Sequence, residues 1–316
     1  MIIITGAAGF IGSNLVRKLN LMDYKDLLLV DDLNDPIKNQ NIKDLKYKEM
    51  VGISDLWQWE KENNAKNIET IFHLGACTNT LEKDANYLYE NNVVYSQRLW
   101  GMAVELQCKF IYASSAATYG NGSLGFSEDP LLMPRLCPLN LYGRSKQDFD
   151  LWILEQKEKP KYWIGLKYFN VFGPGEAHKE QMASVVWHFI QQINRGENLK
   201  LFSASHGYEA GEQKRDFIYI EDALKMTLYG FINNIKSGIY NVGTGKATSF
   251  NELGSVLLKK FPKRKINYMP FPDDLMNYYQ AYTCAEIKNF LSAGLALNPY
   301  SLETSIELYW NTFKNR

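Results

Sequence analysis

The N-terminal sequence IIITGAAGFIG, residues 2–12, has glycines at positions 6, 9 and 12, directly after an apolar run. Glycines at this spacing allow a tight turn after a strand, close approach of the backbone to a pyrophosphate, and close packing of the next helix. The N-terminus of that helix offers free N–H groups and the positive end of its dipole to phosphates. We therefore expect a strand over Ile2–Thr5, a helix over Phe10–Leu19, and a dinucleotide bound at the turn between them.

Short apolar runs alternate with helical patterns through the first half of the chain. The runs typical of buried parallel strands are Leu27–Asp31, Thr70–Leu74, Lys109–Ala113 and Tyr162–Phe169. Helices are expected at Asn86–Leu106 and Ser145–Gln156. This alternation predicts an α/β fold, a doubly wound parallel sheet of the Rossmann type.

The pattern becomes less regular after Pro174. We expect a helix over Met182–Arg195, a loop over Ser203–Lys214, and strands at Phe217–Ile220, Ile239–Val242 and Ile266–Met269. Prolines 270, 272 and 299 predict that loops dominate the C-terminal end. Residues 1–174 are therefore interpreted as a nucleotide-binding domain. Residues 175–316 are interpreted mainly as a smaller substrate-binding lobe, from which later segments can return to the sheet.

Composition excludes several classes of protein. Lys and Arg together number 35, as do Asp and Glu, so the basic excess of a nucleic-acid partner is missing. We find no apolar stretch that could cross a membrane and no signal peptide. The four cysteines are spaced about 30 residues or more apart, without a C-x-x-C motif. We expect a cytoplasmic protein with reduced thiols and no metal site.

Two charged residues follow the second expected strand. Asp31 stands 19 residues after Gly12, a spacing that suits an acid bonding the ribose hydroxyls of NAD. Lys38 follows in the same loop and could offset that charge beside a 2′-phosphate. From its position alone, Lys38 could equally be a solvated surface lysine.

The sequence YGRSK places Tyr142 and Lys146 four residues apart, on one face of a helix. A tyrosine acting as a base near pH 7 needs its pKa lowered by about three units, or roughly 4 kcal/mol. An exposed lysine supplies only about 1 kcal/mol, so the pair requires desolvation. Ser115 follows an expected strand at the edge where open α/β sheets bind ligands. We interpret these three residues as catalytic.

The glycine turn, the Tyr-Lys pair and the strand-end serine together resemble the extended short-chain dehydrogenase/reductase family, over the whole chain. The resemblance implies that Tyr142 is the general acid/base, Lys146 its supporting cation and Ser115 a hydrogen-bonding hydroxyl. The implied cofactor contacts are Gly6, Gly9, Phe10, Ile11, Gly12, Asp31, Asp32, Lys38, Leu74, Gly75, Ala76, Cys77, Thr78, Asn91, Lys146 and Val171.

Further strings narrow the resemblance. Dehydratases of the family usually carry an Asp-Glu pair soon after the serine, where this chain reads AATY, so an epimerase or a simple oxidoreductase is favoured. The strings HLGAC at 73–77, PLNLYG at 138–143 and KRDF at 214–217 are similar to those of members that invert C6″ of an ADP-heptose for the lipopolysaccharide inner core. A UDP-hexose 4-epimerase, another sugar-nucleotide oxidoreductase and a non-catalytic redox sensor remain alternatives.

This resemblance implies a second base, Lys179, and a tightly held NADP. NAD is the less expected cofactor, although Ile53 stands where a second basic residue is usual. The guanidinium of Arg215 suits a diphosphate. The implied substrate contacts are Ser115, Asn170, Gln181, His188, Phe202, Ser205, Arg215 and Tyr279. Members of this kind form ring-like homo-oligomers, pentamers among them.

Overall fold

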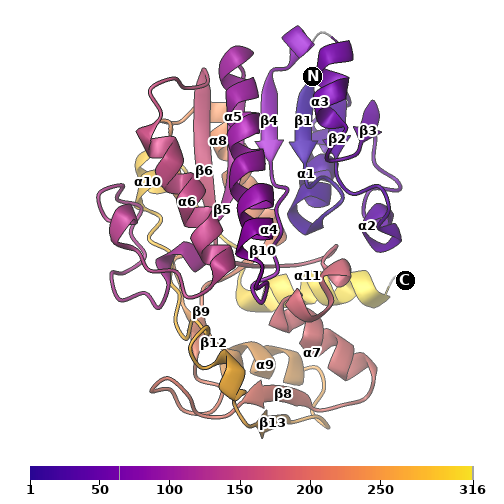
Figure 1. Ribbon diagram of the computed structural model, residues 1–316. Coiled ribbons are helices and arrows are strands. Elements are labelled where there is room, and N and C mark those ends of the chain that lie inside the picture. The colour runs from indigo at the N-terminus through magenta and orange to yellow at the C-terminus, as the bar shows by residue number, and fades with distance from the viewer. Residues whose placement is uncertain (64, 315–316) are drawn as a thin grey trace.

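The computed structural model describes residues 1–63 and 65–314. Its centre is a seven-stranded parallel sheet in the order β11-β6-β5-β4-β1-β2-β3 (Figure 1). The strands are β1 (Ile2–Thr5), β2 (Leu27–Val30), β3 (Glu49–Val51), β4 (Thr70–His73), β5 (Lys109–Ser115), β6 (Tyr162–Tyr168) and β11 (Gly238–Val242). Every residue of β1, β2, β4 and β6 is buried, as strands covered on both faces require. The predicted doubly wound α/β fold is confirmed.

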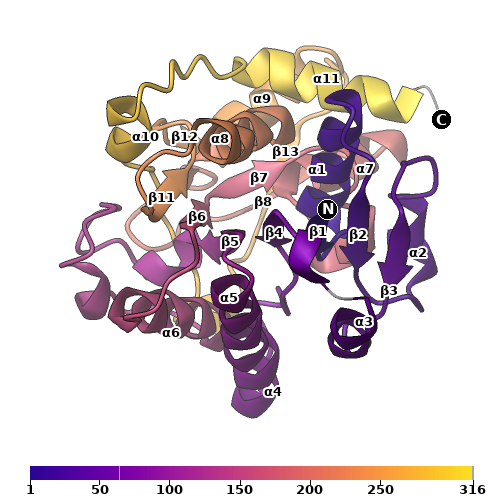
Figure 2. The same ribbon diagram turned by 90° about the horizontal axis from the view of Figure 1, so that it is seen from above.

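Helices cover both faces of this sheet (Figure 2). One face carries α1 (Phe10–Leu21), α8 (Ile220–Asn233) and α11 (Leu302–Lys314). The other carries α3 (Leu56–Glu62), α4 (Ala85–Tyr89), α5 (Tyr95–Glu105) and α6 (Leu141–Glu155). A π-helical turn, η2 (Glu90–Val94), joins α4 to α5. The helix predicted over Asn86–Leu106 is therefore present, with one wide turn inside it.

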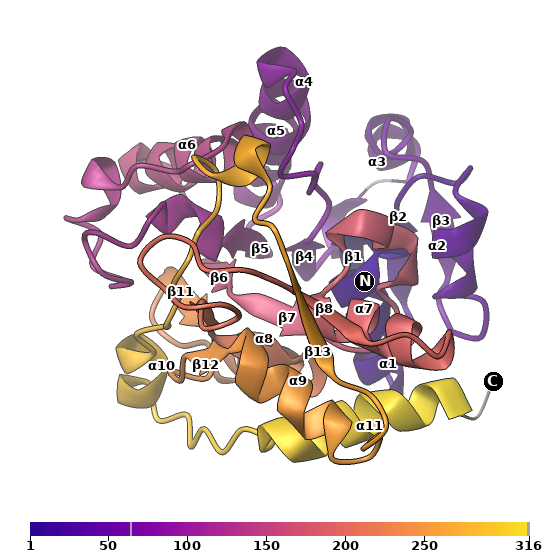
Figure 3. The same ribbon diagram turned by 90° about the horizontal axis from the view of Figure 1, so that it is seen from below.

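A smaller group of elements lies at the carboxyl edge of the sheet (Figures 1 and 3). It contains α7 (Val185–Asn194), β8 (Leu199–Phe202), α9 (Phe250–Leu258) and β13 (Ile266–Met269), with β8 and β13 paired in parallel. Two further pairs lie between this lobe and the sheet: β7 (Asn170–Phe172) with β10 (Phe217–Tyr219), and β9 (Lys214–Arg215) with β12 (Thr248–Ser249). The elements not yet named are α2 (Pro36–Gln40), η1 (Ala65–Asn67), η3 (Ala116–Tyr119), η4 (Met133–Arg135), η5 (Ala177–Met182), η6 (Asp273–Leu275) and α10 (Lys288–Ser292).

The expectation that loops dominate the C-terminal end is wrong for α11. Its apolar residues recur at helical spacing, and Ile306, Tyr309 and Trp310 are buried. The Ser301 Oγ accepts a hydrogen bond from the Thr304 N–H at 3.1 Å, which caps the helix. Pro299 precedes this cap, so it marks the start of a helix rather than a continuing loop.

The chain returns to the large sheet after building part of the lobe. Strand β11 pairs with β6 in parallel, and α8 packs against α1. The division into residues 1–174 and 175–316 stays a prediction. Among the described residues, no helix is both long enough and apolar enough to span a membrane.

Candidate active site

The glycine turn adopts a backbone that side chains would obstruct. Gly6 has φ +66°, and a Cβ there would lie 2.6 Å from the Gly75 nitrogen. A Cβ on Gly12 would lie 2.0 Å from the Gly6 carbonyl oxygen. No side chain caps the N-terminus of α1, whose cap residue is Gly9. The turn therefore leaves helix N–H groups exposed to a ligand, as phosphate binding requires.

A cavity of about 480 Å³ lies against this turn. It is lined by the predicted cofactor residues Gly6, Gly9, Phe10, Ile11, Gly12, Asp31, Asp32, Lys38, Leu74, Gly75, Ala76, Cys77, Thr78 and Asn91. Lys179 and His178 also line it. Of the remaining cofactor predictions, Lys146 is buried beside β5 and Val171 lies in β7, and neither lines the cavity. A second cavity, of about 610 Å³, shares Asp31, Asp32, Ile53, Asn91 and Tyr95 and extends to Trp57.

Asp31 both lines the cavity and supports the turn. Its carboxylate accepts hydrogen bonds from the Ala8 and Asp32 N–H groups, both at 2.8 Å. The Lys38 ammonium lies 3.3 Å from Asp31 Oδ1. Lys38 therefore lines the cavity and is paired with Asp31, while its contact with a cofactor stays a prediction.

Two residues that sequence reasoning missed hold the loop after β4. Asn92 Oδ1 accepts a hydrogen bond from the Cys77 N–H at 2.8 Å, and its Nδ2 donates to the Cys77 carbonyl at 3.0 Å. Thr5 Oγ1 accepts from the Gly75 N–H at 3.1 Å. Burial lowers the pKa of His73 to about 3, so this histidine is a neutral partner of Thr5, at 2.7 Å.

Tyr142 lies in the first turn of α6, which begins at the cap residue Asn140. The Ser115 hydroxyl, at the end of β5, favours the ionised phenol of Tyr142. Burial has the larger effect and raises the pKa of Tyr142. The protein groups around this tyrosine therefore do not by themselves lower its pKa as expected, because desolvation outweighs the effect of Ser115.

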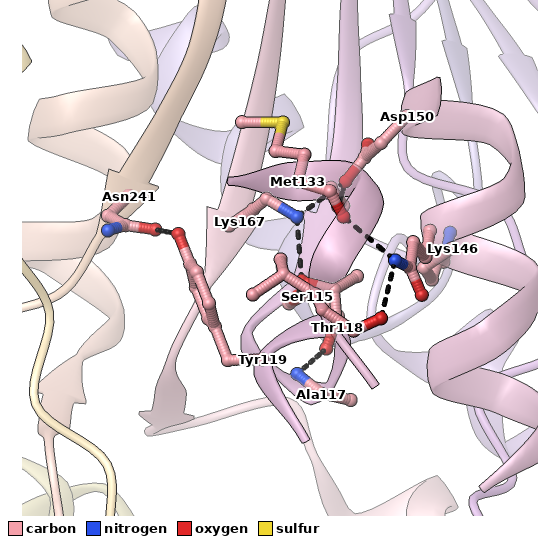
Figure 4. Close-up of polar contacts among 12 residues, drawn as sticks. Ser115, Ala117, Thr118, Tyr119, Met133, Lys146, Asp150, Lys167 and Asn241 are labelled. Carbon is pink, nitrogen blue, oxygen red and sulfur yellow. Dashed lines mark hydrogen bonds and ion pairs between the residues drawn. The ribbon is translucent and has the colours of Figure 1, made fainter. Parts of the chain in front are cut away.

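Lys146 is almost completely buried one turn further along α6 (Figure 4). Its Nζ donates to the Ala113 carbonyl at 3.0 Å. Burial lowers the pKa of Lys146 to about 8, and the Asp150 carboxylate opposes that shift. The desolvation that the Tyr-Lys pair requires is thus present.

Lys179 reaches the cofactor cavity from η5. Burial lowers the pKa of Lys179, and the carboxylate of Glu176 opposes that effect. Glu176 is fully buried and accepts hydrogen bonds from the Gly173 N–H at 3.2 Å and the Ser184 hydroxyl at 2.8 Å. Sequence reasoning missed Glu176, which closes the loop that carries Lys179. In the same region His188 Nε2 lies 3.4 Å from the Gln181 carbonyl.

The structure brings four of the predicted substrate residues together in the smaller lobe. The buried Arg215 guanidinium lies 4.8 Å from the ring centre of Tyr279, and Phe202 lies 6.3 Å from that ring. Ser205 Oγ accepts a hydrogen bond from Gln213 Nε2 at 2.8 Å. Two aromatic residues not predicted, His206 and Phe271, also pack on Tyr279, with ring centres 5.6 and 5.0 Å away.

Asn170 occupies a different segment from this group. It lies in β7, where its Oδ1 accepts a hydrogen bond from Thr283 Oγ1 at 3.2 Å. Ser115, Gln181 and His188 also stand on separate segments: the end of β5, η5 and α7. The predicted substrate residues thus fall into one cluster around Arg215 and four further positions on β5, β7, η5 and α7.

Comparison with known proteins agrees with this geometry. The model of the NAD dependent epimerase/dehydratase family matches residues 2–243. An ADP-L-glycero-D-manno-heptose-6-epimerase of Fusobacterium nucleatum is 43% identical, covering 98% of this chain and 96% of the relative. A protein of the same name from Alkalilimnicola ehrlichii is 40% identical with the same coverage.

Solved structures give the same result. The ADP-L-glycero-D-manno-heptose-6-epimerase of Helicobacter pylori is 30% identical, with a TM-score of 0.83 over 100% of this chain and 96% of the other. A UDP-glucuronic acid 4-epimerase of Bacillus cereus, 24% identical with a TM-score of 0.80 over 99% of each chain, shares the fold. The chain therefore belongs to the NAD dependent epimerase/dehydratase family and, within it, to the group of ADP-L-glycero-D-manno-heptose-6-epimerases.

Proposed function

We propose that this epimerase inverts C6″ of ADP-D-glycero-β-D-manno-heptose to give ADP-L-glycero-β-D-manno-heptose, by transient oxidation with bound NADP. The observation that carries the proposal is the position of Ser115, Tyr142 and Lys146. Ser115 ends β5, Lys146 Nζ donates to the Ala113 carbonyl of the same strand, and Tyr142 lies one turn before Lys146 on α6. Ligands of open α/β sheets bind at the carboxyl ends of the strands. The product would serve the synthesis of the lipopolysaccharide inner core.

The family uses a nicotinamide cofactor, and the residues present fit one. The cavity lies against the glycine turn, and no side chain caps the N-terminus of α1, so the N–H groups there could bind a pyrophosphate. When bound, the nicotinamide supplies the hydride acceptor and donor. NADP rather than NAD is supported by Lys38, whose ammonium offsets the Asp31 charge that would otherwise repel a 2′-phosphate.

Ser115 and Tyr142 would hold the C6″ hydroxyl. As phenolate, Tyr142 takes the hydroxyl proton while the hydrogen on C6″ leaves as hydride, which gives a ketone. The Lys146 ammonium stabilises the phenolate because both groups are desolvated. The ketone then presents its other face, and hydride returns. Lys179 serves as acid/base for that second orientation, since one fixed side chain is poorly placed for both.

The substrate's diphosphate would lie on Arg215. This guanidinium is buried, and among the described residues it contacts the Lys214 carbonyl and the Tyr279 ring but no carboxylate. A buried cation without a counterion is costly, and a diphosphate would supply the missing charge. We assign the other predicted contacts Asn170, Gln181, His188, Phe202, Ser205 and Tyr279 to the sugar and the nucleoside.

The direct test is to incubate the holoenzyme with ADP-D-glycero-β-D-manno-heptose and follow the C6″ proton by NMR. Appearance of the L-glycero epimer in the wild type, and its loss in Tyr142→Phe, supports the proposal. Turnover of UDP-galactose in place of the heptose would identify a UDP-hexose 4-epimerase instead. Release of NAD alone from denatured protein would overturn the cofactor assignment.

Three further proposals accompany this function. The assembly is a ring-like homo-oligomer, a pentamer by family resemblance, and sedimentation velocity measures its mass. The enzyme acts in the cytoplasm, where its sugar-nucleotide substrate would be available. The nucleotide-binding and substrate-binding parts divide near residue 174.

A further inference from the structure

A buried ion pair lies directly behind the catalytic residues. The Lys167 ammonium on β6 lies 2.6 Å from Asp150 Oδ2 on α6, and both side chains are essentially inaccessible to solvent (Figure 4). Neither residue lines the cofactor cavity. A buried pair of this kind is seldom stabilising unless further hydrogen bonds satisfy both ions. Such bonds are present, and they lead to the site.

Asp150 is bonded to the strand that carries Ser115. Its Oδ2 also accepts a hydrogen bond from the Ser114 hydroxyl at 2.7 Å, and its Oδ1 accepts from Tyr112 Oη at 2.8 Å. Both donors lie on β5, on the face opposite to Ser115, because successive strand residues alternate. Asp150 thereby holds the end of β5 from the face opposite to Ser115.

Lys167 is bonded to the turn that follows Ser115. Its Nζ donates a second hydrogen bond to Thr118 Oγ1 at 2.6 Å, and Thr118 Oγ1 donates to the Ser115 carbonyl at 2.9 Å. The peptide group after Ser115 is therefore held through one hydroxyl by the ammonium of Lys167. Ser114 and Thr118 connect the ion pair to the two sides of Ser115.

The same pair is linked to Lys146. Asp150 lies one helical turn after Lys146 on α6, so both side chains are on one face of the helix. Lys146 Nζ donates to the carbonyl of Ala113, the residue before Ser114. Ala113 is thus bonded to Lys146 and Ser114 to Asp150, and Ser115 is linked to Lys167 through Thr118.

We propose that the Asp150–Lys167 ion pair is a positioning unit for the reaction, which holds Ser115 and Lys146 in register with Tyr142. It acts through those residues and touches neither cofactor nor substrate. The proposal rests on the roles assigned to Ser115, Tyr142 and Lys146 under the proposed function.

The ion pair affects the protonation of Lys146 as well as its position. The titratable groups that face Lys146 are Tyr142 and Asp150 on its own helix, Cys77 in the loop after β4, and His73 at the end of β4. Asp150 is the counter-charge that opposes desolvation of the Lys146 ammonium. Replacing Asp150 with a neutral residue should therefore lower the pKa of Lys146, and the unpaired Lys167 would lower it further.

Asp150→Asn tests this with little change of shape. We expect kcat to fall about tenfold or more with KM for the sugar nucleotide near its wild-type value, because positioning acts in the transition state. We also expect the Lys146 Cε resonance, in protein labelled with [¹³C]lysine and assigned by its loss in Lys146→Met, to titrate about one pH unit lower. That titration needs neither cofactor nor substrate.

Asp222→Asn is the matched control. Asp222 is equally buried, and its carboxylate lies 2.8 Å from Lys225 Nζ on α8, on the opposite face of the sheet. The control should lose stability while keeping wild-type kcat and Lys146 titration. If Asp150→Asn also keeps both, the ion pair is merely structural and the proposal is wrong.

Two variants decide the matter if Asp150→Asn does not fold. Thr118→Val removes one hydroxyl link to Ser115 without altering charge, and should lower kcat at unchanged KM. Asp150→Asn combined with Lys167→Met removes both buried charges and should still lower both kcat and the pH at which Lys146 titrates, because the counter-charge of Lys146 is lost. The proposal is wrong if Thr118→Val keeps full activity. It is also wrong if the double variant keeps both the wild-type Lys146 titration and the wild-type kcat. A wild-type enzyme inactive on ADP-heptose would instead reject the proposed function.

Discussion

The Lys38 ammonium lies 3.3 Å from the Asp31 carboxylate, at the edge of the cofactor cavity. Asp31 is almost fully buried and also accepts the Ala8 and Asp32 N–H groups. One carboxylate thus supports the glycine turn and balances the charge of the lysine. A change at Asp31 would therefore affect both the backbone of the glycine turn and the net charge beside the ribose of a bound cofactor.

NADP or NADPH should copurify with the protein, and Lys38→Ala should weaken NADP binding by about tenfold while changing NAD affinity little. The reason is that a bond between an ammonium and a phosphate is charge-assisted, worth about 1.5–3 kcal/mol, whereas NAD has no 2′-phosphate. Calorimetric titration of the stripped protein with both nucleotides measures this. Lys43→Ala, a change of an exposed lysine outside both cavities, is the control. Equal losses for both nucleotides would contradict the assignment.

Gly12→Ala should abolish tight cofactor binding. Its Cβ would lie 2.0 Å from the Gly6 carbonyl oxygen, so the turn or α1 must move. Gly101→Ala is the matched control, because nothing lies within 4 Å of a Cβ at that position in α5. We expect Gly101→Ala to raise the free energy of unfolding by about 0.5–1 kcal/mol with unchanged cofactor affinity. Equal affinity in the two variants would show that the turn is not part of the cofactor site.

The fold could be predicted from the sequence because its signals are local. The apolar runs at Ile2–Thr5 and Ile266–Met269 coincide with β1 and β13, and the glycine turn joins β1 to α1 as expected. The prolines near the C-terminus led to a wrong prediction of loops there. Their spacing alone does not distinguish a loop from a helix that begins after Pro299. There the periodicity of α11 was the better signal.

Residues that support the site were harder to predict, because their partners are distant in sequence. Asp150 and Lys167 lie on a helix and a strand and meet only when α6 packs on the sheet. A signal for Lys167 existed: it is a lone charge inside the apolar run Tyr162–Phe169, and a buried lysine requires a partner. Nothing local to Glu176 or Asn92 indicates the loops that they hold.

Arg215→Ala should raise KM for the sugar nucleotide more than it lowers kcat. A contact with a remote diphosphate acts alike in the ground and transition states, so its loss removes uniform binding. A charge-assisted bidentate contact predicts an increase of roughly tenfold or more. Steady-state kinetics with ADP-heptose measures both constants. Lys214→Ala, at the exposed neighbouring position, should leave KM unchanged, and a wild-type KM in Arg215→Ala would place the diphosphate elsewhere.

The pH dependence of kcat/KM should show a basic limb near pH 8. Burial lowers the pKa of Lys146 to about 8, so the ammonium that stabilises the phenolate is present below this pH and lost above it. His73, whose pKa is about 3, stays neutral across the assay range and contributes no limb. Lys146→Arg retains a positive charge at all these pH values and should remove the limb, even if the rate falls. An unchanged limb in that variant would assign it to another group.

Epimerisation in D₂O should leave the product with no deuterium at C6″. If Tyr142 takes the hydroxyl proton while the C6″ hydrogen moves as hydride, that hydrogen stays on the enzyme and returns to the other face of the ketone. Only the oxygen-bound proton passes through Tyr142 and Lys179, where it exchanges with solvent. The rival route abstracts the carbon-bound proton, and that proton would be replaced by deuterium. Mass and NMR analysis of the product separates the two routes, and substantial deuterium at C6″ would falsify direct hydride transfer.

Tyr142→Phe in the same assay should reduce turnover by roughly 10²-fold or more, because a general acid/base contributes about 10²–10⁴-fold. The Tyr89→Phe enzyme, altered at a half-exposed tyrosine outside both cavities, should keep wild-type turnover and so shows that the loss belongs to the phenol at position 142.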